Sequence, residues 1–257
     1  MSHSDVSPTG DAHEGLEQPP LEIERKFIAD PAAAQLPAQK IWRIEQGYFD
    51  DALEVIPGAP GSASPEGQNA RLRLRIPAGD GWPTESEMSV ALSDEFAQKV
   101  QRFAGPGSGA GYRLRLRVDA ATGQEEGFLT IKGHSSGAAR MELEESINPE
   151  FVKYALAHAT KKKLKKTRYL IEHKGQGWEL DVFMGALLGL VLAELELKTE
   201  DQAIDIPSWA GKEVTEDPRY SNASLAKRAS KELGVGDLMA GAPSSAGSGK
   251  SAPKRGL

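Results

Sequence analysis

Most of the chain alternates between hydrophobic and polar residues with a period of two, as half-buried β-strands do. Residues 112–118 read YRLRLRV and alternate without a break, and residues 21–27 read LEIERKF, with Leu21, Ile23 and Phe27 on one face. The same pattern predicts strands at residues 21–28, 43–49, 71–76, 86–92, 112–118, 128–132, 139–147, 167–173, 178–184 and 190–198. Many strands and few helices indicate a barrel or a sandwich with helical decoration.

Two segments carry helix signals. Asn148 is a good N-cap residue and Pro149 suits the first helical position, which predicts a helix running to about Ala159. A second helix is predicted from about Asn222 to Leu233, where Gly234 would end it. Residues 31–39 are compatible with a shorter helix.

Segments rich in Gly, Ser, Pro and Ala punctuate this pattern, at residues 57–69 and 104–111 and at both ends of the chain. Such segments bury too little apolar surface to offset their ordering entropy. We therefore predict loops at the two internal stretches and disordered tails at the ends. The predicted organisation is a tail at 1–20, one domain at 21–233 with an insertion at about 57–111, and a tail at 234–257.

The composition limits the kinds of partner and metal site that the protein is expected to have. The 257 residues are 39% hydrophobic, carry a formal net charge of -6 and include no cysteine, which excludes disulfides and thiolate metal sites. The mild charge gives no reason to expect a nucleic-acid or membrane partner, and no apolar run is long enough to span a bilayer. We predict a soluble, cytoplasmic protein and make no prediction of its oligomeric state.

Charged residues are concentrated on single strand faces, because side chains at i, i+2 and i+4 point the same way. The ordinary explanation is an antiparallel sheet with one face in water. Like charges two residues apart repel, however, unless opposite charges lie between them, and this arrangement recurs along the chain. The sets are Glu22, Glu24 and Lys26; Arg113, Arg115 and Arg117; Thr130 and Lys132; Arg140, Glu142 and Glu144; Lys166 and Arg168; Glu179 and Asp181; Glu194 and Glu196.

A closed barrel with a polar interior accounts for these faces. A barrel of about eight strands can hold a small ligand. Clustered carboxylates suit hard cations such as Mg²⁺ or Mn²⁺, and Arg and Lys suit phosphate oxygens. Together they describe a phosphoryl-transfer site. The predicted fold class is α+β, mainly antiparallel β: an eight-stranded closed barrel, or tunnel, with a polar interior and flanking helices.

On these residues the chain resembles the CYTH superfamily of triphosphate tunnel metalloenzymes, in particular its bacterial inorganic triphosphatase-like members. The E-x-E-x-K strand is present as Glu22-Ile23-Glu24-Arg25-Lys26. It is followed in family order by an R-x-R strand, LTIKG, RMELEE, KKTRYL, WELDVFMG, LVLAELEL and W-x-G-x-EVTEDPRYSN. The resemblance implies a tunnel that binds a triphosphate through basic side chains and one or two divalent metals.

Residue by residue, the resemblance implies three roles. Metal ligands are expected at Glu22, Glu24, Glu194 and Glu196. A second metal or the attacking water is expected to use Glu142, Glu144 and Asp181. Phosphate is expected to bind Lys26, Arg115, Arg117, Lys132, Lys166, Arg168 and Arg219.

The R-x-R strand has two candidates, because ARLRLRI at residues 70–76 nearly repeats YRLRLRV. We assign the site to Arg115 and Arg117, since their strand forms a plausible hairpin with Phe128–Lys132. Arg73 and Arg75 remain the alternative, or a second set lining the tunnel.

The resulting prediction is hydrolysis of inorganic triphosphate, or of a similar linear triphosphate, by water attack on the terminal phosphorus. The alternatives are an enzyme like class IV adenylate cyclase or thiamine triphosphatase, acting on a nucleoside or thiamine triphosphate, and a non-catalytic polyphosphate-binding module. A cyclase needs a base pocket, and no aromatic platform for one is evident near the motif strands.

Overall fold

The computed structural model describes residues 21–49, 52–56, 70–76, 86–104, 110–136 and 139–239. The predicted tail at 1–20, the predicted loop at 57–69 and the last eighteen positions of the chain lie outside the described residues.

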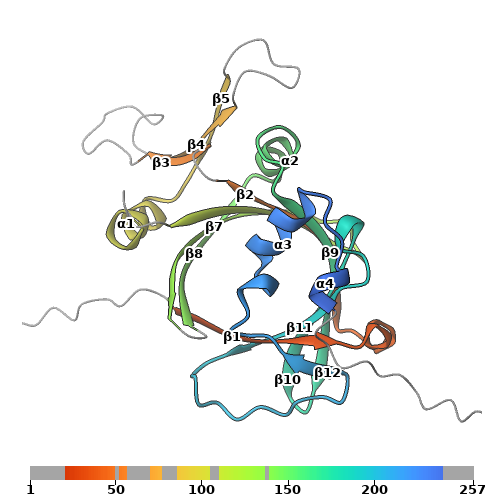
Figure 1. The fold of residues 1–257 in the computed structure, drawn as a ribbon. Helices are drawn as coiled ribbons and strands as arrows, with labels where there is room; N and C mark the ends of the chain where they lie inside the picture. Colours follow the sequence, from red (N-terminus) through yellow and green to blue (C-terminus); the bar gives the residue numbers. More distant parts are fainter. Residues whose placement is uncertain are drawn as a thin grey trace, which may run out of the picture.

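Within the described residues, eight antiparallel strands close into a barrel (Figure 1). Their order around it is β11-β10-β9-β2-β6-β7-β8-β1, and β1 pairs again with β11. The strands are β1 (Leu21–Ala29), β2 (Lys40–Phe49), β6 (Gly111–Asp119), β7 (Glu125–Ser136), β8 (Ala139–Ile147), β9 (Lys163–His173), β10 (Gln176–Phe183) and β11 (Val191–Leu197). The predicted fold class is confirmed.

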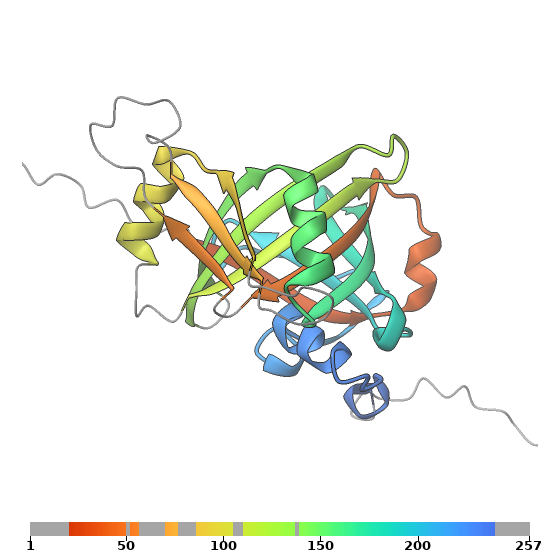
Figure 2. The same ribbon diagram turned by 90° about the horizontal axis from the view of Figure 1, so that it is seen from above.

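At one end of the barrel, the inward-facing side chains of four strands are apolar and pack against a helix. Helix α3 (Asn222–Ala229) lies across this end, as Figures 1 and 2 show from two directions. Its Leu225 and Ala226 are fully buried and pack in one cluster with inward side chains from four strands. Those side chains are Ile28, Leu164, Phe183 and Leu192. The interior is therefore apolar next to α3 along β1, β9, β10 and β11, and its charged residues lie farther from α3 on the same strands.

The outer face of β6, β7 and β8 is covered by two additional layers. Helix α2 (Pro149–His158) lies on it, and so does a separate three-stranded sheet. That sheet is formed by β3 (Leu53–Ile56), β4 (Arg71–Ile76) and β5 (Ser86–Ala91). Leu72 and Leu74 of β4 are fully buried in one core with Leu114 and Leu129 of the barrel. The predicted insertion thus contributes a packed sheet whose first strand starts before residue 57.

Several short elements were not predicted. Helix α1 (Asp94–Phe103) begins at Ser93, whose hydroxyl accepts a hydrogen bond from the Phe96 amide at 3.2 Å. Strand β12 (Ala210–Glu213) joins the edge of β1. The 3₁₀ turns η2 (Gly185–Leu187) and η3 (Pro218–Tyr220) and helix α4 (Gly236–Met239) were not predicted either. The 3₁₀ turn η1 (Pro31–Gln35) lies within residues 31–39, where the sequence was compatible with a shorter helix.

The C-terminal boundary differs from the prediction. Helix α3 ends at Ala229, and α4 lies inside the stretch predicted to be a tail. Leu238 is buried, and its carbonyl accepts a hydrogen bond from the Tyr220 hydroxyl at 2.7 Å. None of the helices in the described ranges has the length and apolar character needed to cross a lipid bilayer.

We expect Gly127→Ala to destabilise the protein by roughly 1–3 kcal/mol, because overpacking a close contact forces a backbone shift. A Cβ atom at Gly127 would lie 2.7 Å from the Ile147 carbonyl oxygen and 3.0 Å from Pro149 Cα, both backbone atoms. Gly111→Ala is the matched control, since nothing lies within 4 Å of its Cβ position. Denaturant unfolding of both variants checks this, and equal stability would contradict the described packing of α2.

Candidate functional site

The hairpin between β6 and β7 sets which arginines face which partners. In its turn, the Asp119 carboxylate accepts hydrogen bonds from the Ala121 and Thr122 amides, both at 2.9 Å. Gly123 follows with a φ of 74°, a conformation that favours glycine. The turn fixes a register in which Arg113 lies directly opposite Thr130.

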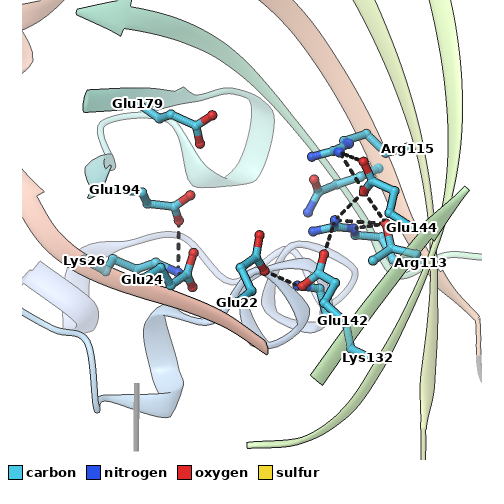
Figure 3. A network of polar contacts seen from close by, with 12 residues as sticks. Glu22, Glu24, Lys26, Arg113, Arg115, Lys132, Glu142, Glu144, Glu179 and Glu194 are labelled. Atoms are coloured by element: carbon cyan, nitrogen blue, oxygen red, sulfur yellow. Dashed lines mark hydrogen bonds and ion pairs between the residues drawn. The ribbon is translucent and has the colours of Figure 1, made fainter. Parts of the chain in front are cut away.

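The arginine–glutamate group, built on β6, β7 and β8, consists of Arg113, Arg115, Lys132, Glu142 and Glu144 (Figure 3). Arg113 contacts Glu142 at 3.0 Å and Glu144 at 3.4 Å, and Arg115 contacts Glu144 at 2.8 Å. Lys132 pairs with Glu142. The Thr130 hydroxyl donates to Glu144 at 2.8 Å and accepts from Arg113 at 3.0 Å. Each buried charge is thus matched by an opposite one.

The Asp181 group lies on β9, β10 and β11 and consists of Lys166, Arg168, Asp181 and Glu194, with Lys26 from β1. Arg168 donates two hydrogen bonds of 2.7 Å to Asp181 and one of 2.8 Å to Glu194. Lys166 also pairs with Asp181, whose side chain is fully buried. Lys26 lies 2.9 Å from Glu194. Glu24 and Glu179 border the group through ion pairs with Lys26 and Arg168.

The pKa values of two neighbouring carboxyl groups, Glu22 on β1 and Glu142 on β8, are shifted in opposite directions. Burial, and then the hydrogen bond and charge of Glu142, raise the pKa of Glu22 to about 8. Burial also favours the neutral form of Glu142, but the hydrogen bond from Glu22 and the charges of Arg113 and Lys132 outweigh it and lower the pKa of Glu142 to about 2. Protonated Glu22 therefore lies beside ionised Glu142 in the free protein.

A cavity of about 360 Å³ lies at the open end of the barrel between these groups. Four arginines and five glutamates supply every charged side chain in its lining, and three apolar side chains complete it. The lining is Leu21, Glu22, Trp42, Ile44, Arg113, Arg115, Arg117, Glu142, Glu144, Arg168, Glu179 and Glu196. Burial and the nearby charge of Arg113 lower the pKa of Arg115 to about 10, so it remains a cation at neutral pH. The arginines suit the oxygens of an anionic ligand, and the carboxylates suit a cation bound together with it.

Two of the four carboxylates predicted to bind metal face each other across β1 and β11. Glu24 lies directly opposite Glu196 in the strand register, and no ion pair of Glu196 occurs within the described residues. Facing like charges on neighbouring strands are destabilising, and a cation between them would remove the repulsion. In the described ranges no three acidic or histidine side chains converge as a ready-made cage. Mg²⁺ is commonly held by one or two carboxylates together with substrate phosphates, so this donor set fits a hard divalent cation.

The structure brings all but one of the predicted site residues to the barrel interior. The exception is Arg219, which lies in η3 with its guanidinium bound to Asp217 at 2.5 Å and its side chain 58% exposed. Asp181 does not join the other two predicted catalytic carboxylates, Glu142 and Glu144, but is enclosed by Lys166 and Arg168.

The two candidate arginine strands lie in different sheets. Arg115 and Arg117 are on barrel strand β6 and line the cavity. Arg73 and Arg75 are on β4 of the outer sheet, where both pair with Glu54. The R-x-R roles themselves remain predictions.

Five residues of the cavity lining were not assigned to the site from the sequence: Leu21, Trp42, Ile44, Arg113 and Glu179. Arg113 and Glu179 share strand faces with assigned residues, so the period-two pattern already contained the signal for them. Trp42 was missed because the predicted strand began at residue 43, whereas β2 begins at Lys40.

Comparison with known proteins places the chain in a family. The CYTH domain profile matches residues 103–230. The inorganic triphosphatase of Acetivibrio thermocellus is 41% identical over 121 residues, which cover 47% of this chain and 75% of the relative. The inorganic triphosphatase of Nitrosomonas europaea is 40% identical over 116 residues, covering 44% and 74%. The solved structure of the inorganic triphosphatase NE1496 aligns with 27% identity and a TM-score of 0.41, over 80% of this chain and 93% of that chain. From the profile match and the identity to these two relatives, the chain belongs to the CYTH domain family.

Proposed function

We propose that the chain hydrolyses inorganic triphosphate, or a closely similar linear triphosphate, in the barrel cavity with the help of a divalent cation. Its curated relatives are inorganic triphosphatases, and the chain is a hydrolase as they are. The observation that carries the proposal is one cavity lined by four arginines and five glutamates.

Arginine side chains at the cavity wall would bind the phosphate oxygens. Arg113, Arg115, Arg117 and Arg168 all reach the cavity from β6 and β9. The planar guanidinium offers two parallel hydrogen bonds to phosphate oxygens. Lys26, Lys132 and Lys166 lie behind them and hold the carboxylates in ion pairs. Because these cations are already fixed by their partners, little reorganisation is needed when the charge of the transition state develops.

The metal would be Mg²⁺ or Mn²⁺, held by Glu24 and Glu196 with Glu22 and Glu194 beside them. When bound, it would neutralise charge on the phosphate oxygens. Glu24 is suited to this role because it is 42% exposed at the side chain and pairs only loosely with Lys26, at 3.2 Å.

The attacking water would be oriented by Glu142 and Glu144. Glu144 is the more accessible of the two, with 35% of its side chain exposed, and it lines the cavity. Water oxygen bonds to the terminal phosphorus while the bond from that phosphorus to the bridging oxygen breaks. The water protons pass to the carboxylate and to solvent, and the products are orthophosphate and diphosphate. Phosphoryl transfer of this kind depends on positioning and charge more than on a strong base. Asp181 acts by holding Arg168 and Lys166 in place.

Product analysis tests the proposal. Purified protein with Mg²⁺ or Mn²⁺ is given inorganic triphosphate, ATP, thiamine triphosphate or long-chain polyphosphate, and products are followed by phosphorus NMR. We expect orthophosphate and diphosphate in equal amounts from triphosphate. Diphosphate from ATP without orthophosphate would instead indicate a cyclase, and binding of triphosphate without turnover would indicate a binding module.

A further inference from the structure

Thr130 lies in the middle of a row of three inward-facing residues on neighbouring strands. It is directly opposite Arg113 of β6 on one side and directly opposite Glu144 of β8 on the other. Thr130 is fully buried, and it is the one uncharged residue of this row. Its hydroxyl is therefore placed to bind both charged neighbours.

The Thr130 hydroxyl uses its full hydrogen-bonding capacity. It donates its proton to Glu144 Oε2 at 2.8 Å, and it accepts from Arg113 Nε at 3.3 Å and from Arg113 Nη2 at 3.0 Å. A hydroxyl has one proton to donate and two lone pairs to accept with. All three are occupied, so the hydroxyl has one orientation and holds the Glu144 carboxylate at a defined atom.

The two oxygens of Glu144 have different contacts, and Figure 3 shows Arg113 and Arg115 converging on this carboxylate. Oε2 is bonded to Thr130, to Arg115 Nη2 at 2.8 Å and to Arg113 Nη2 at 3.4 Å. Within the described residues Oε1 is bonded to Arg115 alone, at 2.8 Å. Since Glu144 lines the cavity, the oxygen with fewer partners is the one available to a water molecule there.

Thr130 is the one of these three donors that does not line the cavity. Arg113 and Arg115 do line it, and phosphate oxygens bound there compete with Glu144 for the same N–H groups. Arg115 Nε is buried and has no hydrogen-bond partner in the described part of the chain, so this arginine still has a donor to offer. The bond from Thr130 is therefore the contact of Glu144 that persists when the arginines bind phosphate.

We propose that Thr130 is a positioning residue, which holds Glu144 Oε2 so that Oε1 orients the attacking water while Arg113 and Arg115 bind the triphosphate. This rests on the proposed function and adds the residue that keeps its water-orienting carboxylate in place. Arg113 keeps its ion pair with Glu142 when the hydroxyl is removed. Loss of the hydroxyl should therefore lower kcat more than it raises KM.

Kinetics of Thr130→Val and Thr130→Ser with inorganic triphosphate and Mg²⁺ or Mn²⁺ test this role. Valine keeps the branched shape without the hydroxyl, and we expect kcat to fall about tenfold to a hundredfold with KM nearly unchanged. Serine keeps the hydroxyl and should retain most of kcat. Thr160→Val is the matched control, because the Thr160 hydroxyl donates to the Tyr48 carbonyl at 2.7 Å and does not line the cavity. Its kcat should equal that of the wild type even if its melting temperature falls.

A double-mutant cycle with Glu144→Gln shows whether Thr130 acts through this carboxylate. Glu144→Gln alone should lower kcat, and adding Thr130→Val to it should lower kcat much less than the same change does in the wild type. If Thr130→Val does not fold, Thr130→Ala takes its place in the cycle.

Three results would overturn the role of Thr130: a normal kcat in Thr130→Val, a loss of about tenfold in kcat in a folded Thr130→Ser, or full additivity in the cycle. A normal kcat in Glu144→Gln contradicts the proposed role of Glu144, and a wild type without turnover contradicts the proposed function. Either of these two results also overturns the role of Thr130, whereas the first three contradict that role alone.

Discussion

Arg115→Ala and Arg117→Ala are each expected to lower kcat/KM for inorganic triphosphate about tenfold to a hundredfold. Each substitution removes a charge-assisted hydrogen bond to phosphate, which contributes roughly 1.5–3 kcal/mol. Both guanidinium groups line the cavity, where Arg115 pairs with Glu144 and Arg117 with Glu126. Initial rates over a range of triphosphate concentrations give the comparison, after circular dichroism has shown that each variant folds.

Arg73→Ala and Arg75→Ala are the matched controls, because the same R-L-R-L-R sequence occurs on β4 outside the barrel. Each control loses an ion pair with Glu54 on the outer sheet and no cavity contact. We expect near-normal kcat/KM for both. If these two variants are inactive while the Arg115 and Arg117 variants work normally, the assignment of the phosphate-binding strand is wrong. Near-normal rates for all four would remove the phosphate-binding role of these arginines altogether.

Glu24→Gln and Glu196→Gln are expected to abolish turnover while leaving the stability of the metal-free protein unchanged or raising it. The two carboxylates lie directly opposite each other on β1 and β11, so neutralising either relieves repulsion in the absence of metal. Mutation of a residue that only hydrogen-bonds to a metal ligand lowers metal affinity or activity about 10–100-fold. Loss of a ligand itself should lower them at least as much. Phosphate release and melting temperature in EDTA measure the two effects.

Glu200→Gln provides the control, since this exposed glutamate follows β11 in a turn. It should change neither property. If Glu196→Gln melts at a much lower temperature than the wild type in the absence of metal, this carboxylate stabilises the barrel, and its role as a metal ligand is contradicted.

The barrel was predictable because most of its strands alternate cleanly between core and cavity. Residues 112–118 and 190–198 show the alternation and form β6 and β11. Strand β12 could not be predicted, since AGKE has no alternation and becomes a strand only because β1 offers it an edge. The four residues of β3 are likewise too few for a period to be read.

The sequence shows which side chains share one face of a strand, but it does not show which strands lie next to it. The pattern R-L-R-L-R gives the same alternation on β4 and on β6, and only pairing separates them. Strand β4 pairs with β3 and β5, whereas β6 pairs with β2 and β7 of the barrel. Alternation reveals which side chains point the same way and leaves open what lies opposite them.

The ion-pair partners inside the barrel could not be predicted from the sequence either, because they are set by which strands are neighbours. Asp181 has the sequence signature of a cavity carboxylate, yet Arg168 lies opposite it in the register of β9 and β10 and binds it with two hydrogen bonds. Arg113 meets Glu142 and Glu144 only because β7 lies between β6 and β8. These contacts join residues far apart in the chain, so no local pattern could assign them.

The central claim, that the carboxylates of the barrel use a divalent cation to hydrolyse triphosphate, is tested most directly by metal removal and return. Orthophosphate released from inorganic triphosphate by the wild type is measured with Mg²⁺ or Mn²⁺, then in EDTA, then after metal is restored in excess. The account predicts turnover in the first condition, none in the second and recovery in the third. Full turnover in EDTA, or none with either metal, would contradict it.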